Sequence, residues 1–281
     1  MSEPLNRLSI GYSPCPNDTF IFYAMMHGKV DLGGLSYGEP YLEDVETLNS
    51  WAMKGRLDVT KLSFHALGHV LDEYCVLATG SALGRGCGPL LVAGKEVELA
   101  ELRNKRIAIP GKYTTAALLL QMLLPGCTNL VEMRFDMIMD ALQEGQVDAG
   151  VIIHESRFTY QQYGLYCLQD LGQWWEDSSG MPIPLGAIVA RRSLGRDNIL
   201  RIEKAIGDSV EFAFNQPEAC LDYIRQHSQE LAEEVVQSHI GLYVNEYSRN
   251  LGDEGFAAIE LFLARGREAG ALPESGLGLR I

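Results

Sequence analysis

The chain has 281 residues, of which 47% are hydrophobic and 21% charged, and its formal net charge is -14. This length is sufficient for two compact domains or one large one. The negative charge argues against a general binder of nucleic acid or of an anionic membrane surface, because phosphate groups need a positive field. A small anionic ligand remains possible, since a cleft can be locally positive in an acidic protein.

Cysteine usage and hydropathy favour a cytoplasmic protein. None of the six cysteines forms a Cys-x-x-Cys pair, and a chain of this size does not need disulfides for stability, so reduced thiols are expected. The N-terminal stretch MSEPLNRLSIGYS has no apolar core typical of a secretory signal. No apolar run approaches the roughly 18 residues of a membrane span. We therefore expect no membrane partner; the sequence favours no particular oligomeric state.

Helices and strands alternate in the first third of the chain. Asn17 and Asp18 are good N-cap residues for the first helix, and Gly55 suits the end of the second. The alternation predicts a mostly parallel sheet with helices on its faces. Strands are expected over 7–13, 57–63 and 75–80, and helices over 19–28, 42–55 and 67–74.

The glycine-rich stretch GRGCGPLLVAG, residues 84–94, breaks this pattern as a hinge or crossover would. A second alternation follows it, and then a loop containing WWEDSSGMPIP. A strand over 184–192 is expected to return to the first domain. The second alternation has strands over 105–111, 130–136 and 148–154 and helices over 114–124 and 137–145, and the remainder has helices over 197–215, 217–227, 230–244 and 253–269.

One small unit occurs twice in this order. Gly55-x-x-Asp58 and Gly145-x-x-Asp148 each stand between a helix and an apolar strand. A chance match is the alternative, because this arrangement is common in α/β proteins. We prefer two similar lobes that face each other across a cleft, where ligands bind beyond the carboxyl ends of the strands. The first lobe comprises 1–90 and 188–281 and the second 91–187, with crossovers near 88–94 and 184–190.

Two strands end in polar residues that would face this cleft. Lys61 would be costly to bury without a partner, which could be a ligand carboxylate or a neighbouring acid. Ser63 adds a hydrogen-bond donor to the same strand. His154 ends the other strand, where a neutral imidazole suits proton abstraction, although lone histidines are usually structural. Arg157 could bind a carboxylate or pair with Glu155.

Two strand-to-helix turns could hold an anion. In SPCPNDTF, from Ser13 onwards, open helix amides favour anions, but a plain capped turn fits equally well. Cys15 in this turn is expected to be a packed thiol, because no base is assigned to it. In IPGKYTTAA, Thr114 and Thr115 could add hydroxyls to the helix amides, or Thr114 could simply cap the helix. The six histidines show no metal-ligand spacing, so no metal is expected.

A resemblance to a known family rests on seven stretches, SPCPNDTFIFYA, LEDVETLN, TKLS, ALGRGCGPLLVA, PGKYTTA, IIHESRFTY and PLGAI. They resemble the 1,4-dihydroxy-6-naphthoate synthases of the futalosine route to menaquinone. The resemblance covers about residues 8–192 and implies a type II periplasmic-binding-protein-like fold, α/β with two lobes. It also implies a lyase that cleaves a C–C bond of cyclic dehypoxanthinyl futalosine, a small carboxylate, without a metal or organic cofactor.

The resemblance assigns roles to individual residues. His154 would be the catalytic base. Lys61, Leu62 and Ser63, together with Thr114 and Thr115, would contact the substrate. The local patterns add further candidate substrate contacts, which are Ser13, Asn17, Asp18 and Arg157.

Three other functions occur on a similar fold and stay open at this point. A solute-binding protein fits the two lobes, but the missing export signal argues against it. Chorismate dehydratase acts earlier in the same pathway, and the histidine motif favours the synthase over it. An effector domain of a transcription regulator is the third, although no helix-turn-helix segment precedes the lobes.

Overall fold

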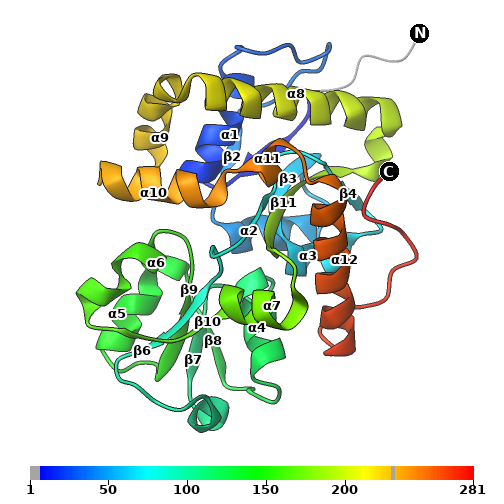
Figure 1. The fold of residues 1–281 in the computed structure, drawn as a ribbon. Helices are drawn as coiled ribbons and strands as arrows, with labels where there is room; N and C mark the ends of the chain where they lie inside the picture. Colours follow the sequence, from blue (N-terminus) through cyan, green and yellow to red (C-terminus); the bar gives the residue numbers. More distant parts are fainter. Residues whose placement is uncertain (1–6, 229–231) are drawn as a thin grey trace.

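The computed structural model describes residues 7–228 and 232–281 and shows two α/β lobes, each built on its own sheet (Figure 1). The sheet of the first lobe runs in the order β2-β1-β3-β11-β4, and β5 pairs with β11. Its strands are β1 (Ile10–Tyr12), β2 (Tyr41–Leu42), β3 (Val59–Ser63), β4 (Tyr74–Val76), β5 (Ala82–Gly84) and β11 (Ile183–Arg191).

The sheet of the second lobe runs in the order β10-β6-β9-β7-β8. The chain leaves the first sheet after Gly84 and returns to it at Ile183, where β11 begins. The lobe division at residues 90 and 188 stays a prediction. The strands of this sheet are β6 (Leu90–Ala93), β7 (Ile107–Ile109), β8 (Leu130–Glu132), β9 (Ala149–Ile152) and β10 (Tyr166–Asp170).

Both sheets are mixed, so the expectation of a mostly parallel sheet is wrong. In the first sheet β1, β2 and β3 are parallel, while β11 runs antiparallel to β3, β4 and β5. In the second, β7, β8 and β9 are parallel, while β6 runs antiparallel to β9 and β10. The reason is that β6 and β11 each enter a sheet from the opposite lobe. The orders β2-β1-β3-β11 and β8-β7-β9-β6 therefore correspond, which confirms the internal repeat.

The repeated Gly-x-x-Asp unit makes the same contacts in both lobes. Gly55 and Gly145 have φ of 58° and 68°, left-handed values that suit glycine at the end of a helix. Asp58 Oδ2 accepts a hydrogen bond from the backbone of Ser9 at 2.8 Å, and Asp148 Oδ2 accepts one from Arg106 at 2.9 Å. Each aspartate thus ties the start of its strand to the neighbouring parallel strand.

Helices cover the faces of both sheets (Figure 1). The first helix begins at Pro16 with Cys15 as its N-cap, so the expected caps Asn17 and Asp18 lie inside its first turn. The predicted start of the tail helix at Glu230 lies outside the described residues. No described helix is long and apolar enough to cross a bilayer. The helices are α1 (Pro16–Met26), α2 (Val45–Ala52), α3 (Phe64–Val70), α4 (Thr115–Leu123), α5 (Ile138–Gln143), α6 (Ser156–Thr159), α7 (Leu171–Ser179), α8 (Arg196–Asn215), α9 (Leu221–His227), α10 (Glu233–Tyr243), α11 (Glu246–Arg249) and α12 (Gly252–Glu268).

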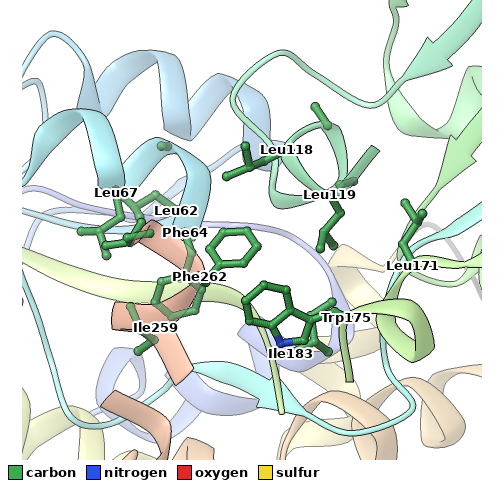
Figure 2. Packing of buried hydrophobic residues seen from close by; sticks show 14 of the residues in the cluster. Leu62, Phe64, Leu67, Leu118, Leu119, Leu171, Trp175, Ile183, Ile259 and Phe262 are labelled. Carbon is green, nitrogen blue, oxygen red and sulfur yellow. The ribbon is translucent and has the colours of Figure 1, made fainter. Parts of the chain in front are cut away.

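One apolar cluster joins the two lobes (Figure 2). It combines Leu62 and Phe64 of the first lobe with Leu118 of α4 and Trp175 of α7. The Trp175 ring packs edge-on against Phe262 of α12, with ring centroids 5.3 Å apart. Helix α7 lies where the sequence predicted a loop, and its burial of Trp175 explains why this segment is ordered. The shared cluster fixes the cleft edges relative to each other.

We expect Gly172→Ala to destabilise the protein, because α7 begins against the crossover at Gly88. A Cβ on Gly172 would lie 2.7 Å from the Cα of Gly88, closer than real contacts allow. Overpacking of this kind costs about 1–3 kcal/mol in free energy of unfolding, which urea denaturation measures. Gly94→Ala is the control, since its Cβ would meet nothing within 4 Å. Equal stability of the two variants would contradict the packing described here.

Candidate active site

A cavity lies between the lobes at the carboxyl ends of β1, β3, β7 and β9. Nine of the ten residues selected from the sequence line it, and Arg157 does not. The structure thus brings together side chains from both halves of the repeat. The nine are Ser13, Asn17, Asp18, Lys61, Leu62, Ser63, Thr114, Thr115 and His154.

The floor of the cavity holds a buried ion pair. Lys61 Nζ lies 2.7 Å from Asp18 Oδ1, and both side chains are shielded from solvent. Asp18 also accepts hydrogen bonds from the backbone and hydroxyl of Ser13, at 3.1 and 2.8 Å, and from the amide of Asn17 at 2.9 Å. Of the two partners predicted for Lys61, the neighbouring acid is the one present. Its charge is therefore already compensated inside the protein.

The start of α4 presents backbone donors to the cavity. Thr114 is the N-cap, and its hydroxyl donates to Gly111 at 2.8 Å and accepts from Ala117 at 3.2 Å. The Thr115 hydroxyl donates to Leu185 O at 2.7 Å. The hydroxyl protons of Thr114 and Thr115 are therefore both donated to backbone carbonyls and are not free for a ligand. The first amides of a helix have no carbonyl partner in that helix, so those of Thr115 and Ala116 are available to an anion.

The Ser63 hydroxyl accepts a hydrogen bond within the protein, which leaves its own proton available for donation. Its hydroxyl oxygen accepts a hydrogen bond from Asn49 Nδ2 at 3.2 Å, and Asn49 Oδ1 accepts from the Ser63 backbone at 2.9 Å. The Ser63 hydroxyl can therefore donate toward the cavity. Apolar side chains including Leu62, Ile153 and Leu185 line the space between these polar ends, which suits a flat ring.

His154 follows β9 in a strained backbone conformation. Its φ is 56°, and it is the one non-glycine residue with positive φ among those described. Such geometry costs about 1–3 kcal/mol and is concentrated at functional sites. The ring lies edge-on to Phe135 at 4.9 Å and parallel to His239 at 6.0 Å between centroids. These neighbours hold the imidazole at the edge of the cavity.

Burial lowers the pKa of His154 below its usual value. The negative charges of Glu155 and Asp18 oppose this shift in pKa, and the charge of Lys61 adds to it. Burial is the largest of these causes, so the net direction is downward. The ring is therefore neutral at pH 7 and carries a lone pair that can accept a proton.

His239 of α10 is a cavity residue that the sequence reasoning missed. Its side chain is 1% exposed, and its Nε2 lies 3.0 Å from Asn17 Oδ1. Burial holds the pKa of this imidazole well below its usual value, with the neighbouring His154 adding to the shift. Tyr243 of the same helix also lines the cavity. No local spacing could have indicated these residues, because α10 reaches the site only through the packing of the C-terminal helices.

Arg157 makes structural contacts instead of facing the cavity. Its guanidinium donates to Asp170 at 2.6 Å and to Gly88 O at 2.5 Å. The ion partner is therefore Asp170, and the predicted alternative of a pair with Glu155 is wrong. The side chain ties the segment after His154 to β10 and to the crossover, and nothing in its position suggests a ligand contact.

A polar contact between the lobes borders the cavity. The carboxylate of Glu46 in α2 accepts the backbone N–H of Tyr113 in the second lobe, at 3.0 and 3.2 Å. Asn49 of the same helix donates to Tyr113 O at 3.3 Å. Burial raises the pKa of Glu46, while these donors oppose the shift. The contact holds the turn before α4 against the first lobe.

Comparison with known families and proteins identifies the family of this chain. A family model described as menaquinone biosynthesis matches residues 8–268. The chain belongs to the menaquinone-biosynthesis family. The predicted connection with menaquinone biosynthesis is thereby confirmed.

Two curated relatives extend this result. The chain is 49% identical to a 1,4-dihydroxy-6-naphthoate synthase of Thermus thermophilus over 95% of this chain and 96% of the relative. It is 46% identical to a protein of the same name from Streptomyces coelicolor over 96% of each chain. Both comparisons cover nearly the full length of this chain and of the relative.

Solved structures support the fold. A protein from Archaeoglobus fulgidus, 37% identical, superposes with a TM-score of 0.89 over 95% of this chain and 98% of that one. A Candida albicans protein whose title reports the generic periplasmic-binding-protein fold has a TM-score of 0.68 at 16% identity, over 96% and 92% of the two chains. The periplasmic-binding-protein-like fold expected from the sequence is confirmed.

We expect Lys61→Met to destabilise the protein, because it leaves the buried carboxylate of Asp18 without its cation. Breaking one half of a buried ion pair costs about 3–5 kcal/mol in free energy of unfolding, and chemical denaturation measures this loss. The double variant Lys61→Met with Asp18→Asn should recover part of it, since no charge remains buried. A stable single variant would show that the pair does not organise the cavity floor.

Proposed function

We propose that this chain is a lyase of menaquinone biosynthesis that forms 1,4-dihydroxy-6-naphthoate from cyclic dehypoxanthinyl futalosine, with His154 as the base. The observation that carries the proposal is the placement of a neutral imidazole and a helix N-terminus on one largely apolar cavity. The substrate is a small molecule. A cytoplasmic location belongs to the same proposal.

The substrate carboxylate binds at the start of α4. Lys61 is a weaker anchor, because its charge is already paired with Asp18. The amides of Thr115 and Ala116, together with the positive end of the helix dipole, favour an anion at this position. The ring system then occupies the apolar space beside Leu62 and Leu185.

His154 starts the reaction by taking one proton from the substrate. The electrons released drive cleavage of a C–C bond with loss of the sugar-derived fragment, and formation of the aromatic naphthalene ring supplies driving force. General base catalysis contributes roughly 10²–10⁴-fold to the rate. The hydroxyl proton of Ser63 can stabilise negative charge that develops on a substrate oxygen, because Asn49 fixes its oxygen without using that proton.

We expect His154→Asn to lower kcat by at least about 100-fold, because the side chain can no longer accept a proton. Asparagine tolerates the left-handed backbone that His154 adopts, so the fold should be preserved. The measurement is the absorbance of naphthoate formed from cyclic dehypoxanthinyl futalosine. His69→Asn is the matched control, since His69 lies on α3 outside the cavity.

The same assay separates the alternatives. A protein that binds the compound without turnover would be a solute-binding protein, and one that converts chorismate would be a dehydratase. Near-normal turnover by His154→Asn would refute the assignment of the base but not the overall reaction.

The pH dependence of kcat/KM should reflect the lowered pKa of His154. Because burial depresses this pKa, the acid limb should lie below the value of about 6.5 that is usual for histidine. Activity is retained above that limb and lost as pH falls through it, since protonation removes the lone pair. Glu155→Gln should move the limb to still lower pH, because the carboxylate raises the pKa of His154. An acid limb above pH 7 would contradict this environment.

A further inference from the structure

A cluster of metal-binding atoms lies beside the proposed base, in a second hollow next to the main cavity. Cys15, His154 and Glu155 all line this hollow. The thiol sulfur, a ring nitrogen and a carboxylate oxygen of these residues lie within 4.8 Å of one another. Cys15 comes from the turn before α1 and the other two from the turn after β9, so only the folded protein brings them together.

A second observation indicates that a cation or proton donor belongs beside this cluster. Glu155 Oε2 and His239 Nδ1 are buried, face each other at 3.9 Å, and have no hydrogen-bond partner among the described residues. His239 is 1% exposed. Two such acceptors shielded from water are unfavourable unless a proton donor or a cation lies between them.

The hydrogen-bond network fixes His239 Nδ1 as an acceptor. Asn17 Nδ2 donates to the Asp18 carboxylate at 2.9 Å, which turns Asn17 Oδ1 toward His239 Nε2 at 3.0 Å. An amide oxygen accepts only, so Nε2 carries the proton of the neutral ring. The lone pair is therefore on Nδ1, directed toward Glu155.

We propose that Cys15, His154 and Glu155, with His239 as a fourth donor, form a binding site for Zn²⁺ that blocks the base when it is occupied. Sulfur, imidazole and carboxylate are the ligands that zinc takes in proteins, at bond lengths of about 2.0–2.3 Å. Four donors at such distances from one ion lie about 3.3–3.8 Å apart in a tetrahedron. The donor atoms of Cys15, His154 and Glu155 lie within 4.8 Å of one another, so binding needs a contraction of up to about 1.5 Å. His239 Nδ1 lies 3.9 Å from Glu155 Oε2 but outside this group of three, so it has to move further to join.

The charges around the cluster are compatible with a divalent cation. Burial raises the pKa of the Cys15 thiol, so metal binding has to release its proton to solvent. The resulting thiolate and the Glu155 carboxylate together balance the two positive charges of the ion. The positively charged side chain that lines this hollow is that of Arg134, and it is already paired with Asp136. Asp44, which also lines the hollow, is engaged as the N-cap of α2.

Occupation of this site would inhibit the enzyme, an effect that rests on the proposed role of His154. A neutral imidazole has one lone pair, and a bound metal uses it. The ion and the reacting proton therefore compete for the same nitrogen. The site would make turnover sensitive to free zinc.

The first test is spectroscopic and does not depend on the reaction. Metal-free protein is titrated with Co²⁺, which reports a thiolate ligand by a charge-transfer band in the near ultraviolet. We expect this band at one equivalent and its loss when Zn²⁺ displaces the cobalt. Cys15→Ala should abolish the band and weaken zinc binding by at least about tenfold. Among the six cysteines, all described, Cys167 is the exposed one, so Cys167→Ala is the control and should leave the band unchanged.

The second test measures turnover against zinc occupancy. Wild-type activity should fall in proportion to bound Zn²⁺ and return after EDTA, while Cys15→Ala keeps its metal-free activity and loses at least about tenfold in zinc sensitivity. Absence of the charge-transfer band in wild type, or its persistence in Cys15→Ala, would overturn the site. Full occupancy with unchanged turnover would overturn the block on the base. A metal-free enzyme that leaves its substrate unconverted would refute the proposed function, and the cobalt spectrum would still report on the site.

Discussion

The organisation of the cavity depends on the buried carboxylate of Asp18. It accepts hydrogen bonds from Ser13 and Asn17 and forms an ion pair with Lys61. These contacts tie the start of α1 to the middle of β3 and compensate the charge of Lys61. They also orient Asn17, which fixes the tautomer of His239 behind the proposed base. A charge buried this deeply is tolerated because both oxygens of Asp18 accept hydrogen bonds and one of them pairs with Lys61.

The two lobes contribute different groups to the cavity. The second lobe contributes His154 and the open amides of α4, while the first contributes the compensated polar floor and the Ser63 hydroxyl. The apolar cluster around Trp175 and the contact of Glu46 with Tyr113 hold these edges together. The fold is that of periplasmic binding proteins, and the proposed base His154 adds a group suited to proton transfer to its cleft.

Much of this arrangement could be predicted from short stretches of sequence. The Gly-x-x-Asp repeat identified both strand starts, and polar residues after buried strands indicated the cleft. Strand β10 and helix α7 were missed, because β10 is a partly exposed strand with little periodicity and the burial of Trp175 depends on distant packing. His239 was missed because its partner Asn17 lies 222 positions away. The resemblance supplied the reaction, which spacing alone does not indicate.

The most direct test of the account is a crystal structure of the protein with 1,4-dihydroxy-6-naphthoate bound. We predict the carboxylate at the amides of Thr115 and Ala116, the ring in the apolar space, and the His154 imidazole facing the bound ring. The Asp18–Lys61 pair should stay intact. A carboxylate bound to Lys61 with that pair broken, or a product bound away from His154, would contradict the account.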